Sequence, residues 1–313
     1  MAFYFGGEKM LTLDESKIRK GRPVGLPYVG SKKKISKKIV QLIVQNFGRD
    51  KTVYDIFGGG GAITAECIIN GLDVRYNDLD KTVVDMFARV LNSERDWLKG
   101  LIIDRGQFFY IRDKENKTTE DELKLLVNSF GNGRKGYIYG KVNSDLKYQL
   151  AMDVITNHDT FEGYKQTRTY KELVANYEKE LQLGRLQHLR NLERLEQLQR
   201  LQQLERLQQL KGDSIQPFTA FDYKYFSNLT NAIIYLDPPY EGTGSFYHEN
   251  EMDYEEFYDW AVMMSHNNIV LISSYTVSDE RFEEVYNFDK AKSTFQGGIG
   301  NGHTEKLFMV KSN

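Results

Sequence analysis

An apolar run that stops at two consecutive prolines is the feature that most constrains this chain. Residues 232–236 read Ala-Ile-Ile-Tyr-Leu, a composition typical of a buried strand. Asp237 follows, and Pro238 and Pro239 then prevent a strand or helix from continuing. Open α/β sheets bind their ligands at the carboxyl ends of strands. The pattern therefore predicts a binding corner at residues 237–240, although an ordinary strand and a tight turn would also account for it.

A strand, a glycine loop and a helix are predicted earlier in the chain, over residues 53–57, 58–61 and 62–70. Glycines let the backbone approach a ligand closely, and the start of a helix offers unpaired N–H donors. Residues 74–78 are predicted as the next strand, which ends in Asp78, where Rossmann-like folds bind ribose hydroxyls. These features predict an α/β fold with a Rossmann-like sheet and helices on both of its faces.

The order of these motifs resembles the Dam-like DNA adenine methyltransferases, particularly those of phages. That family has an N-terminal cofactor motif, a Phe-x-Gly-x-Gly loop, an inserted target-recognition region and then Asp-Pro-Pro-Tyr. Residues 28–32, Tyr-Val-Gly-Ser-Lys, look like the first motif, residues 57–61 like the loop, and residues 237–240 like the last motif. Residues 269–275 and 304–308 are similar to the late strands of the family. The resemblance covers both ends of the chain well and the middle poorly.

The resemblance implies S-adenosylmethionine as the methyl donor, S-adenosylhomocysteine as the product and a set of cofactor-binding residues. The N-terminal motif would contact the methionine part, the acid at position 78 the ribose, and the residues ahead of the Asp-Pro-Pro-Tyr strand the adenine. The cofactor-binding residues implied are Tyr28, Lys32, Asp55, Phe57, Gly59, Gly61, Asp78, Asp222, Tyr223 and Asp237.

The resemblance also implies site-specific transfer of a methyl group to the exocyclic amine of an adenine flipped out of double-stranded DNA. Asp237 and the Pro238 carbonyl would accept hydrogen bonds from the amine, and the base would stack on Tyr240. The amine would attack the methyl group in line, so that positioning and electrostatics supply the catalysis. The catalytic residues implied are Asp237, Pro238, Pro239 and Tyr240.

Two alternatives stay open at this point. The first is an amino-methyltransferase that acts on cytosine, RNA or a protein glutamine, because the glycine loop does not distinguish these substrates. The second is a non-catalytic interaction protein built on a methyltransferase core, with a leucine repeat as its functional part. Asp at the head of Pro-Pro-Tyr and the intact cofactor motifs favour the DNA adenine enzyme over both.

Charge limits how the chain could bind DNA. The formal net charge is only −2 over 313 residues, so DNA binding must depend on local basic surfaces. Two sets of basic residues are candidates, one before a predicted helix and one in a glycine- and tyrosine-rich segment. They are Lys32, Lys33, Lys34, Lys37 and Lys38, and then Arg134, Lys135, Lys141 and Lys147.

Composition excludes other classes of protein. The single cysteine, Cys67, cannot form an internal disulfide, which suits a reducing cytoplasm, and its apolar neighbours predict a core thiol. Residues 1–24 lack the apolar stretch of a signal peptide, and no apolar run is long enough to span a membrane. The histidines have no metal-ligand spacing, so no metal is expected.

The domain organisation follows from where strand and helix alternation breaks. We expect a polar N-terminal leader over residues 1–26 and a discontinuous cofactor-binding catalytic domain over residues 27–95 and 225–313. The intervening residues 96–224 are expected to form the inserted target-recognition region.

A leucine repeat occupies residues 186–210, with leucine at every third position between Gln, Glu and Arg. A heptad coiled coil needs an average spacing of about 3.5, so this is not one. On an α-helix each leucine steps back by about 60°, so no single face would be buried. The residue types favour helix, whereas a threefold winding would align the leucines. The repeat is interpreted as a spacer or a self-association contact.

Overall fold

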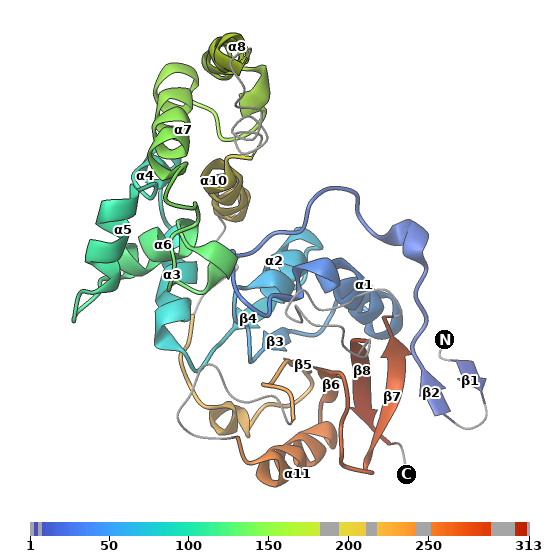
Figure 1. Ribbon diagram of the computed structural model, residues 1–313. Helices are drawn as coiled ribbons and strands as arrows, with labels where there is room; N and C mark the ends of the chain where they lie inside the picture. The colour runs from blue at the N-terminus through green and yellow to red at the C-terminus, as the bar shows by residue number, and fades with distance from the viewer. Residues whose placement is uncertain are drawn as a thin grey trace. The chain divides into compact units, whose positions relative to one another are not determined.

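The computed structural model describes most of the chain, in two compact units that are treated separately below (Figure 1). The described residues are 3–5, 8–181, 194–210, 218–241, 252–288 and 304–311. The first unit comprises Met1–Val24, Gly30–Val84 and Gly212–Asn313, and the second comprises Gly25–Val29 and Asp85–Lys211.

A six-stranded sheet forms the centre of the first unit, in the order β4-β3-β5-β6-β8-β7. Strands β4, β3, β5 and β6 run parallel, whereas β8 is antiparallel to both of its neighbours. The bounds are β3 Val53–Asp55, β4 Val74–Tyr76, β5 Ile233–Leu236, β6 Ile269–Ser274, β7 Phe282–Asn287 and β8 Lys306–Val310.

Alternate side chains of β5 point to opposite faces of this sheet, as strand geometry requires. Ile233 and Tyr235 pack into one core with α1 (Ser36–Phe47) and α2 (Ala62–Ile69), whereas Ile234 and Leu236 pack into another with α11 (Tyr254–Ser265). Figure 1 shows these helices on the two sides of the sheet. The predicted α/β fold, with a Rossmann-like sheet and helices on both faces, is confirmed.

Smaller elements complete the first unit. An N-terminal hairpin precedes the main sheet, and its second strand packs near β7. The bounds are β1 Phe3–Phe5, β2 Glu8–Met10, η1 Glu15–Lys17, η2 Lys32–Lys34 and η6 Tyr223–Phe226. Helix α3, Lys81–Leu91, leads from the first unit into the second.

The described part of the second unit is helical. Two of its helices begin with capping boxes, in which Asp104 pairs with Gln107 and Thr118 with Asp121. The bounds are α4 Arg95–Lys99, α5 Arg105–Arg112, α6 Thr119–Val127, η3 Phe130–Asn132, α7 Ser144–His158, η4 Tyr164–Gln166, α8 Arg168–Leu181 and α10 Glu196–Gln208.

The leucine repeat forms α10 where the structure describes it, while residues 186–193 lie outside the described residues. Leu198, Leu201, Leu204 and Leu207 are all fully buried within the second unit, and α10 packs against both α4 and α6. Because the leucine stripe winds round the helix, burying it requires neighbours on more than one side. The described part of the repeat is therefore an internal core helix, and the interpretation as a spacer is wrong for this part.

Three further findings concern the single cysteine, the length of the helices and possible metal ligands. Cys67 is fully buried in α2, and burial raises the pKa of its thiol, which confirms a core thiol. None of the helices in the described part of the chain has the length and apolar character needed to cross a membrane. Among the described residues, no cluster of His, Cys, Asp or Glu is suited to hold a metal ion.

Candidate active site

Acidic residues gather at one edge of the main sheet because its parallel strands end there. Asp55 is the last residue of β3, Asp78 follows β4, and Asp237 follows β5. Strand β8 is antiparallel, so its beginning lies at the same edge, where Glu305 precedes it. This edge is where a doubly wound sheet binds ligands.

The glycine loop between β3 and α2 has a backbone that favours glycine. Gly59 and Gly61 have φ angles of +48° and +68°, in the left-handed region. A Cβ atom at Gly58 would lie 2.3 Å from the ring of Tyr76. The N–H of Gly59 donates to the Asp78 carboxylate at 2.7 Å, so the loop is fastened to the end of the neighbouring strand.

Asp55 is buried below this loop. Its Oδ2 accepts hydrogen bonds from the hydroxyl and the backbone N–H of Thr64, at 2.6 and 3.1 Å, and so holds the first turn of α2. Its Oδ1 is buried with no hydrogen-bond donor among the described residues. Burial raises the pKa of Asp55 to about 7, against the hydrogen bonds from Thr64.

The segment ahead of β5 is fixed by Asn77. Its side-chain amide donates to the carbonyl of Phe221 at 2.9 Å, and its oxygen accepts from the N–H of Phe221 at 3.0 Å. Asp222 follows and caps η6 through a hydrogen bond from the N–H of Lys224 at 2.9 Å. Asn77 therefore places the 221–222 segment beside Asp78.

The aromatic side chains of residues 221–226 are partly buried in the core and partly exposed, whereas the sequence pattern predicts that they are mostly buried. Tyr223 is buried, lies against Phe57 at a ring distance of 6.2 Å, and has its pKa raised to about 12 by burial. Phe226 is also buried, whereas Phe221 and Tyr225 are 40% and 65% exposed and stack on each other at 4.1 Å. Alternation predicts core positions for Phe221, Tyr225, Phe226 and Tyr235, which is confirmed for the last two and wrong for the first two. Tyr225 lies in the 3₁₀ turn η6, which does not follow a strand's period of two, and Phe221 lies in the irregular segment before it.

Lys32 and Asp237 form an ion pair, with 2.6 Å between Nζ and Oδ1. Burial raises the pKa of Asp237 to about 7, opposed by the Lys32 ammonium. Burial would lower the pKa of Lys32, but the charges of Asp237 and Glu305 outweigh it, so the pKa is raised. Lys32 is thus a cation beside a carboxylate that titrates near neutral pH.

Tyr240 completes the corner. Its hydroxyl accepts from Lys32 Nζ and donates to the Glu305 carboxylate, whose two oxygens both lie 2.8 Å away. Burial raises the pKa of Tyr240 far above its usual range, so the hydroxyl keeps its proton. The Tyr275 ring lies 4.4 Å from that of Tyr240. We call Lys32, Asp237, Tyr240 and Glu305 the catalytic corner.

The double proline is held from the other side. Pro238 is buried, and the Pro239 carbonyl accepts a hydrogen bond from the Tyr254 hydroxyl at 2.6 Å. Tyr254 belongs to the first turn of α11, so that helix supports the turn that carries Asp237.

Sequence reasoning gave no chemical role to Glu305 of the corner, nor to Ser273, which contacts it. Glu305 is 5% exposed and accepts a hydrogen bond from the Ser273 hydroxyl at 2.8 Å, and Ser273 is fully buried near the end of β6. One sequence signal could have identified Glu305: it is an acidic residue directly before an apolar strand, where a buried charge is costly unless it has polar partners. Tyr28, by contrast, falls in the second unit, where its N–H donates to the Leu26 carbonyl at 2.8 Å.

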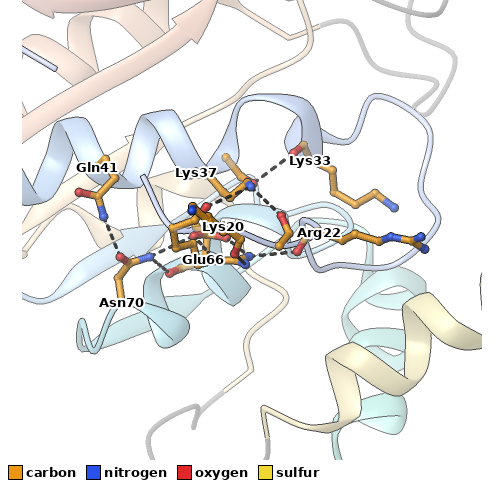
Figure 2. A network of polar contacts seen from close by, with 10 residues as sticks. Lys20, Arg22, Lys33, Lys37, Gln41, Glu66 and Asn70 are labelled. Atoms are coloured by element: carbon orange, nitrogen blue, oxygen red, sulfur yellow. Dashed lines mark hydrogen bonds and ion pairs between the residues drawn. The ribbon is translucent and has the colours of Figure 1, made fainter. Parts of the chain in front are cut away.

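The N-terminal leader is fixed to α1 and α2 by a network of polar contacts (Figure 2). Arg19 makes a bidentate ion pair with the buried Glu66 of α2, at 2.7 and 2.6 Å, and Lys37 donates to the Gly21 carbonyl at 2.7 Å. In Figure 2 the side chains of Arg22 and Lys33 extend away from these contacts.

The basic residues are thus not equivalent. Lys32 and Lys37 are committed to internal contacts, and Lys38 pairs with Glu15. In the second unit, Lys147 is buried, donates to the Arg194 carbonyl at 2.9 Å and lies over the ring of Tyr139. The suggestion that Lys147 offers its charge to DNA is therefore wrong.

The residues present fit S-adenosylmethionine. The positive φ angles of Gly59 and Gly61 shape a loop at a helix start, and Asp55 presents a buried oxygen without a donor beside it. Asp78 adds a carboxylate at the end of the neighbouring strand, suited to hydroxyl groups. This donor and acceptor set suits a cofactor with an ammonium group and a ribose.

Comparison with models of known protein families identifies the family of this chain. The family model for D12 class N6 adenine-specific DNA methyltransferases matches residues 28–293. Comparison with the curated proteins finds no match.

Among solved structures, the chain is similar to the rRNA methyltransferase AviRa from Streptomyces viridochromogenes, with 12% identity, 96% of this chain and 93% of that chain covered, and a TM-score of 0.39. It is also similar to a putative methylase from Haemophilus influenzae, with 9% identity, coverage of 93% and 99%, and a TM-score of 0.32. The family assignment rests on the family model, which spans most of the chain. The chain belongs to the D12 class of N6 adenine-specific DNA methyltransferases and uses S-adenosylmethionine as its methyl donor.

Proposed function

We propose that the catalytic corner holds the exocyclic amine of a flipped adenine, and that the glycine loop and its neighbours hold the cofactor. The observation that carries this proposal is the position of Asp237 at the carboxyl end of a central strand, with its side chain 15% exposed and Lys32 as its ionic partner at 2.6 Å. A carboxylate that is largely withdrawn from water at that edge suits a binding role, because its desolvation is costly.

Asp237 is the first acceptor for the amine and the Pro238 carbonyl is the second. The hydrogen bonds that the amine donates to these two acceptors keep electron density on its nitrogen, which otherwise shares its lone pair with the ring. After transfer the nitrogen carries one proton too many, and the Asp237 carboxylate accepts it. Pro239 shapes the turn, with its carbonyl already held by Tyr254.

Tyr240 supplies the aromatic surface for the base. A base taken out of a duplex loses its stacking partners, and a ring in the pocket replaces part of that energy. The Tyr240 hydroxyl is held by Lys32 and Glu305, so the ring has little freedom to turn. We assign to Tyr240 the stacking role that its sequence position predicts.

The cofactor-binding residues are assigned by their place at the sheet edge. Asp55, Gly59 and Gly61 line the loop for the methionine part, and Asp78 is the acceptor for the ribose. When bound, the cofactor supplies an electrophilic methyl group together with its own leaving group. Lys32, Phe57, Asp222, Tyr223 and Tyr28 keep the cofactor roles that the resemblance implies, as proposals.

The second unit is our candidate for the target-recognition region. It carries exposed lysines and exposed apolar side chains in one segment, which suits contact with a nucleic acid. Lys135 and Lys141 are exposed, and Phe130 and Val142 are 77% and 80% exposed. The division of the catalytic domain at residues 95 and 225, with a leader over residues 1–26, stays part of this proposal.

The remaining assignments concern the setting of the enzyme. A DNA substrate and a lone buried cysteine suit the cytoplasm of a bacterial host, with a phage as the source of the gene and a link to restriction-modification. Self-association through the leucine repeat stays a prediction. Light scattering of the full chain tests it, with a dimer expected and a monomer at all concentrations against it.

The test is expression in a bacterial host that lacks adenine methylation, followed by sequencing of its DNA for modified bases. We expect N6-methyladenine at one recurrent short sequence. Asp237→Ala, expressed to the same level, is the matched control and should leave the DNA unmodified. Modified cytosine, or unmodified DNA with the wild-type chain, would contradict the proposal.

A further inference from the structure

A chain of hydrogen bonds runs from the end of β6 to the catalytic corner. The Ser273 hydroxyl donates to Glu305 at 2.8 Å, and Glu305 accepts from the Tyr240 hydroxyl at 2.8 Å. The same carboxylate lies 3.6 Å from the Lys32 ammonium, which in turn contacts Asp237. Glu305 thus contacts both the ring and the cation of the corner without occupying the position of the amine acceptor.

The fold explains why an acid can hold this position. Strand β8 is antiparallel to β6, so the residue before it lies at the edge where the parallel strands end. The N–H of Phe288 donates to the Glu305 carbonyl at 2.9 Å, which fixes its backbone beside the end of β7. Hydrogen bonds therefore fix both the backbone and the side chain of Glu305.

We propose that Glu305 is a positioning residue for methyl transfer: it anchors the Tyr240 hydroxyl and takes part of the Lys32 charge, so that the ring and Asp237 stay ready for the flipped base. This inference rests on the proposed roles of Asp237 and Tyr240. It adds a residue that lies outside the Asp-Pro-Pro-Tyr motif, close to the C-terminus of the chain.

The charge balance of the corner supports this role. One cation, Lys32, faces two carboxylates, Asp237 and Glu305. With Glu305 removed, Lys32 would pair with Asp237 alone and compete more strongly with the incoming amine for its lone pairs. A hydrogen bond to a charged group is strong, so both contacts of Glu305 are large enough to affect the rate.

Two variants separate the two contacts of Glu305. Glu305→Ala removes both, and Glu305→Gln keeps an oxygen for the Tyr240 hydroxyl but removes the charge. Methyl transfer from tritiated S-adenosylmethionine to plasmid DNA gives kcat and KM, and calorimetry gives cofactor affinity. We expect kcat to fall about tenfold or more in Glu305→Ala, with the cofactor dissociation constant unchanged.

A matched control lies on the next strand. Glu284 of β7 forms an ion pair with Lys306 at 2.6 Å. Lys306 directly follows Glu305 in the sequence, but this ion pair is partly exposed and includes no residue of the corner. Glu284→Gln removes the same charge and should leave kcat and KM unchanged. If wild type and Glu284→Gln methylate DNA and both Glu305 variants match them, this inference fails alone. If wild type transfers no methyl group, the proposed function fails.

A double-mutant cycle tests the anchoring of the ring. Tyr240→Phe removes the hydroxyl that Glu305 holds but keeps the stacking surface. If Glu305 acts through Tyr240, Glu305→Ala costs less in the Tyr240→Phe background than in wild type. An equal loss in both backgrounds, or a melting temperature lowered enough to explain the loss, would overturn the anchoring role.

The pH profile tests the sharing of charge. Asp237 must be ionised to accept hydrogen bonds, so activity falls at low pH as it becomes protonated. The Glu305 carboxylate raises the pKa of Asp237, and Lys32 lowers it. The acid limb of kcat should therefore move to lower pH in Glu305→Gln and to higher pH in Lys32→Gln. An acid limb unmoved in Glu305→Gln would overturn this half of the proposal.

The other groups that face Asp237 stay in place in these variants, so the shift reports Glu305 itself. Among the residues that the structure describes, these groups are Asp55 at the end of β3, Asp78 after β4, and Tyr235 and Tyr240 on its own segment.

Discussion

The catalytic corner and the core around α10 both withdraw polar side chains from water, but the group at the centre of each differs. The corner is centred on a cation: Lys32 lies between the carboxylates of Asp237 and Glu305. The core around α10 is centred on a neutral amide, the fully buried Gln197, which donates to Asn128 at 2.5 Å and to the Ile103 carbonyl at 3.1 Å.

The two kinds of buried group suit different roles. Buried charges contribute little to stability, because desolvation offsets their attraction, but they bind a substrate that can replace one of the partners. A neutral amide inside an apolar core fixes a register. The α10 helix needs this, because a shift by three residues would replace each leucine with another leucine.

The largest expected effect breaks the corner without unfolding the protein. Asp237→Ala should lower kcat by roughly 10³-fold, because it removes the acceptor on which the reaction depends. Cofactor binding, measured by calorimetry, should survive. A kcat within tenfold of wild type would show that the charges of the corner are not catalytic.

The second prediction concerns the stability of the core around α10. Leu201→Ala leaves a cavity in α10 at a fully buried position and should cost about 2–5 kcal/mol of stability in the second unit. Urea unfolding followed by circular dichroism measures the loss. The exposed Gln209, at the end of the same helix, gives the matched control, and Gln209→Ala should change stability by less than about 0.5 kcal/mol.

The third prediction concerns the register. Gln197→Leu removes the amide that donates to the Asn128 oxygen and leaves that buried oxygen with only the longer hydrogen bond from the Ile103 N–H, at 3.3 Å. We expect a loss of about 1–3 kcal/mol. Native-state hydrogen exchange measures it, and the extra loss of protection should be confined to α10 and α6. Unchanged protection would show that leucine packing alone sets the register.

The fourth prediction uses pH to separate the two regions. In the corner, burial raises the pKa of Asp237 to about 7, so activity should fall about tenfold per pH unit below 7. A carboxyl with a raised pKa contributes stability at low pH that is lost as pH rises through 7. Acidification from 7 to 4 should therefore stabilise the corner while it stops the reaction.

The second unit should respond in the opposite direction. Burial would raise the pKa of Asp121, but hydrogen bonds from Thr118 and Lys114 outweigh it and lower the pKa. A carboxylate of this kind contributes stability above its unfolded pKa that is lost as pH falls through the folded pKa. Hydrogen exchange at pH 4 and pH 7 compares the two units, and the same trend in both would contradict the comparison.

Local patterns in the sequence predicted the sheet and the glycine loop of the first unit well. Strand-forming residues, prolines and glycines act on the backbone within a few positions of themselves. The strand before Asp237 and the loop from Gly58 to Gly61 were therefore predicted close to their observed positions. The partners of these residues were not predictable, because Lys32 and Glu305 reach the corner from opposite ends of the chain. Strand pairing decides that contact, and a single sequence does not reveal it.

The second unit was harder to predict because its main sequence signal is the leucine repeat, whose leucines do not lie on a single face of the helix. The helical preference of Gln, Glu, Arg and Leu predicted α10, but the winding leucine stripe says nothing about what covers it. Burial on several sides depends on α4 and α6, whose residues lie far from the repeat in sequence.

The most direct test of the central claim follows the methyl group itself. The purified chain is incubated with DNA and S-adenosylmethionine carrying a trideuterated methyl group, and the nucleosides are then separated and weighed by mass spectrometry. We expect the label in N6-methyladenine with wild type and its absence with Asp237→Ala. Label in cytosine, or equal label in adenine with both proteins, would contradict the account.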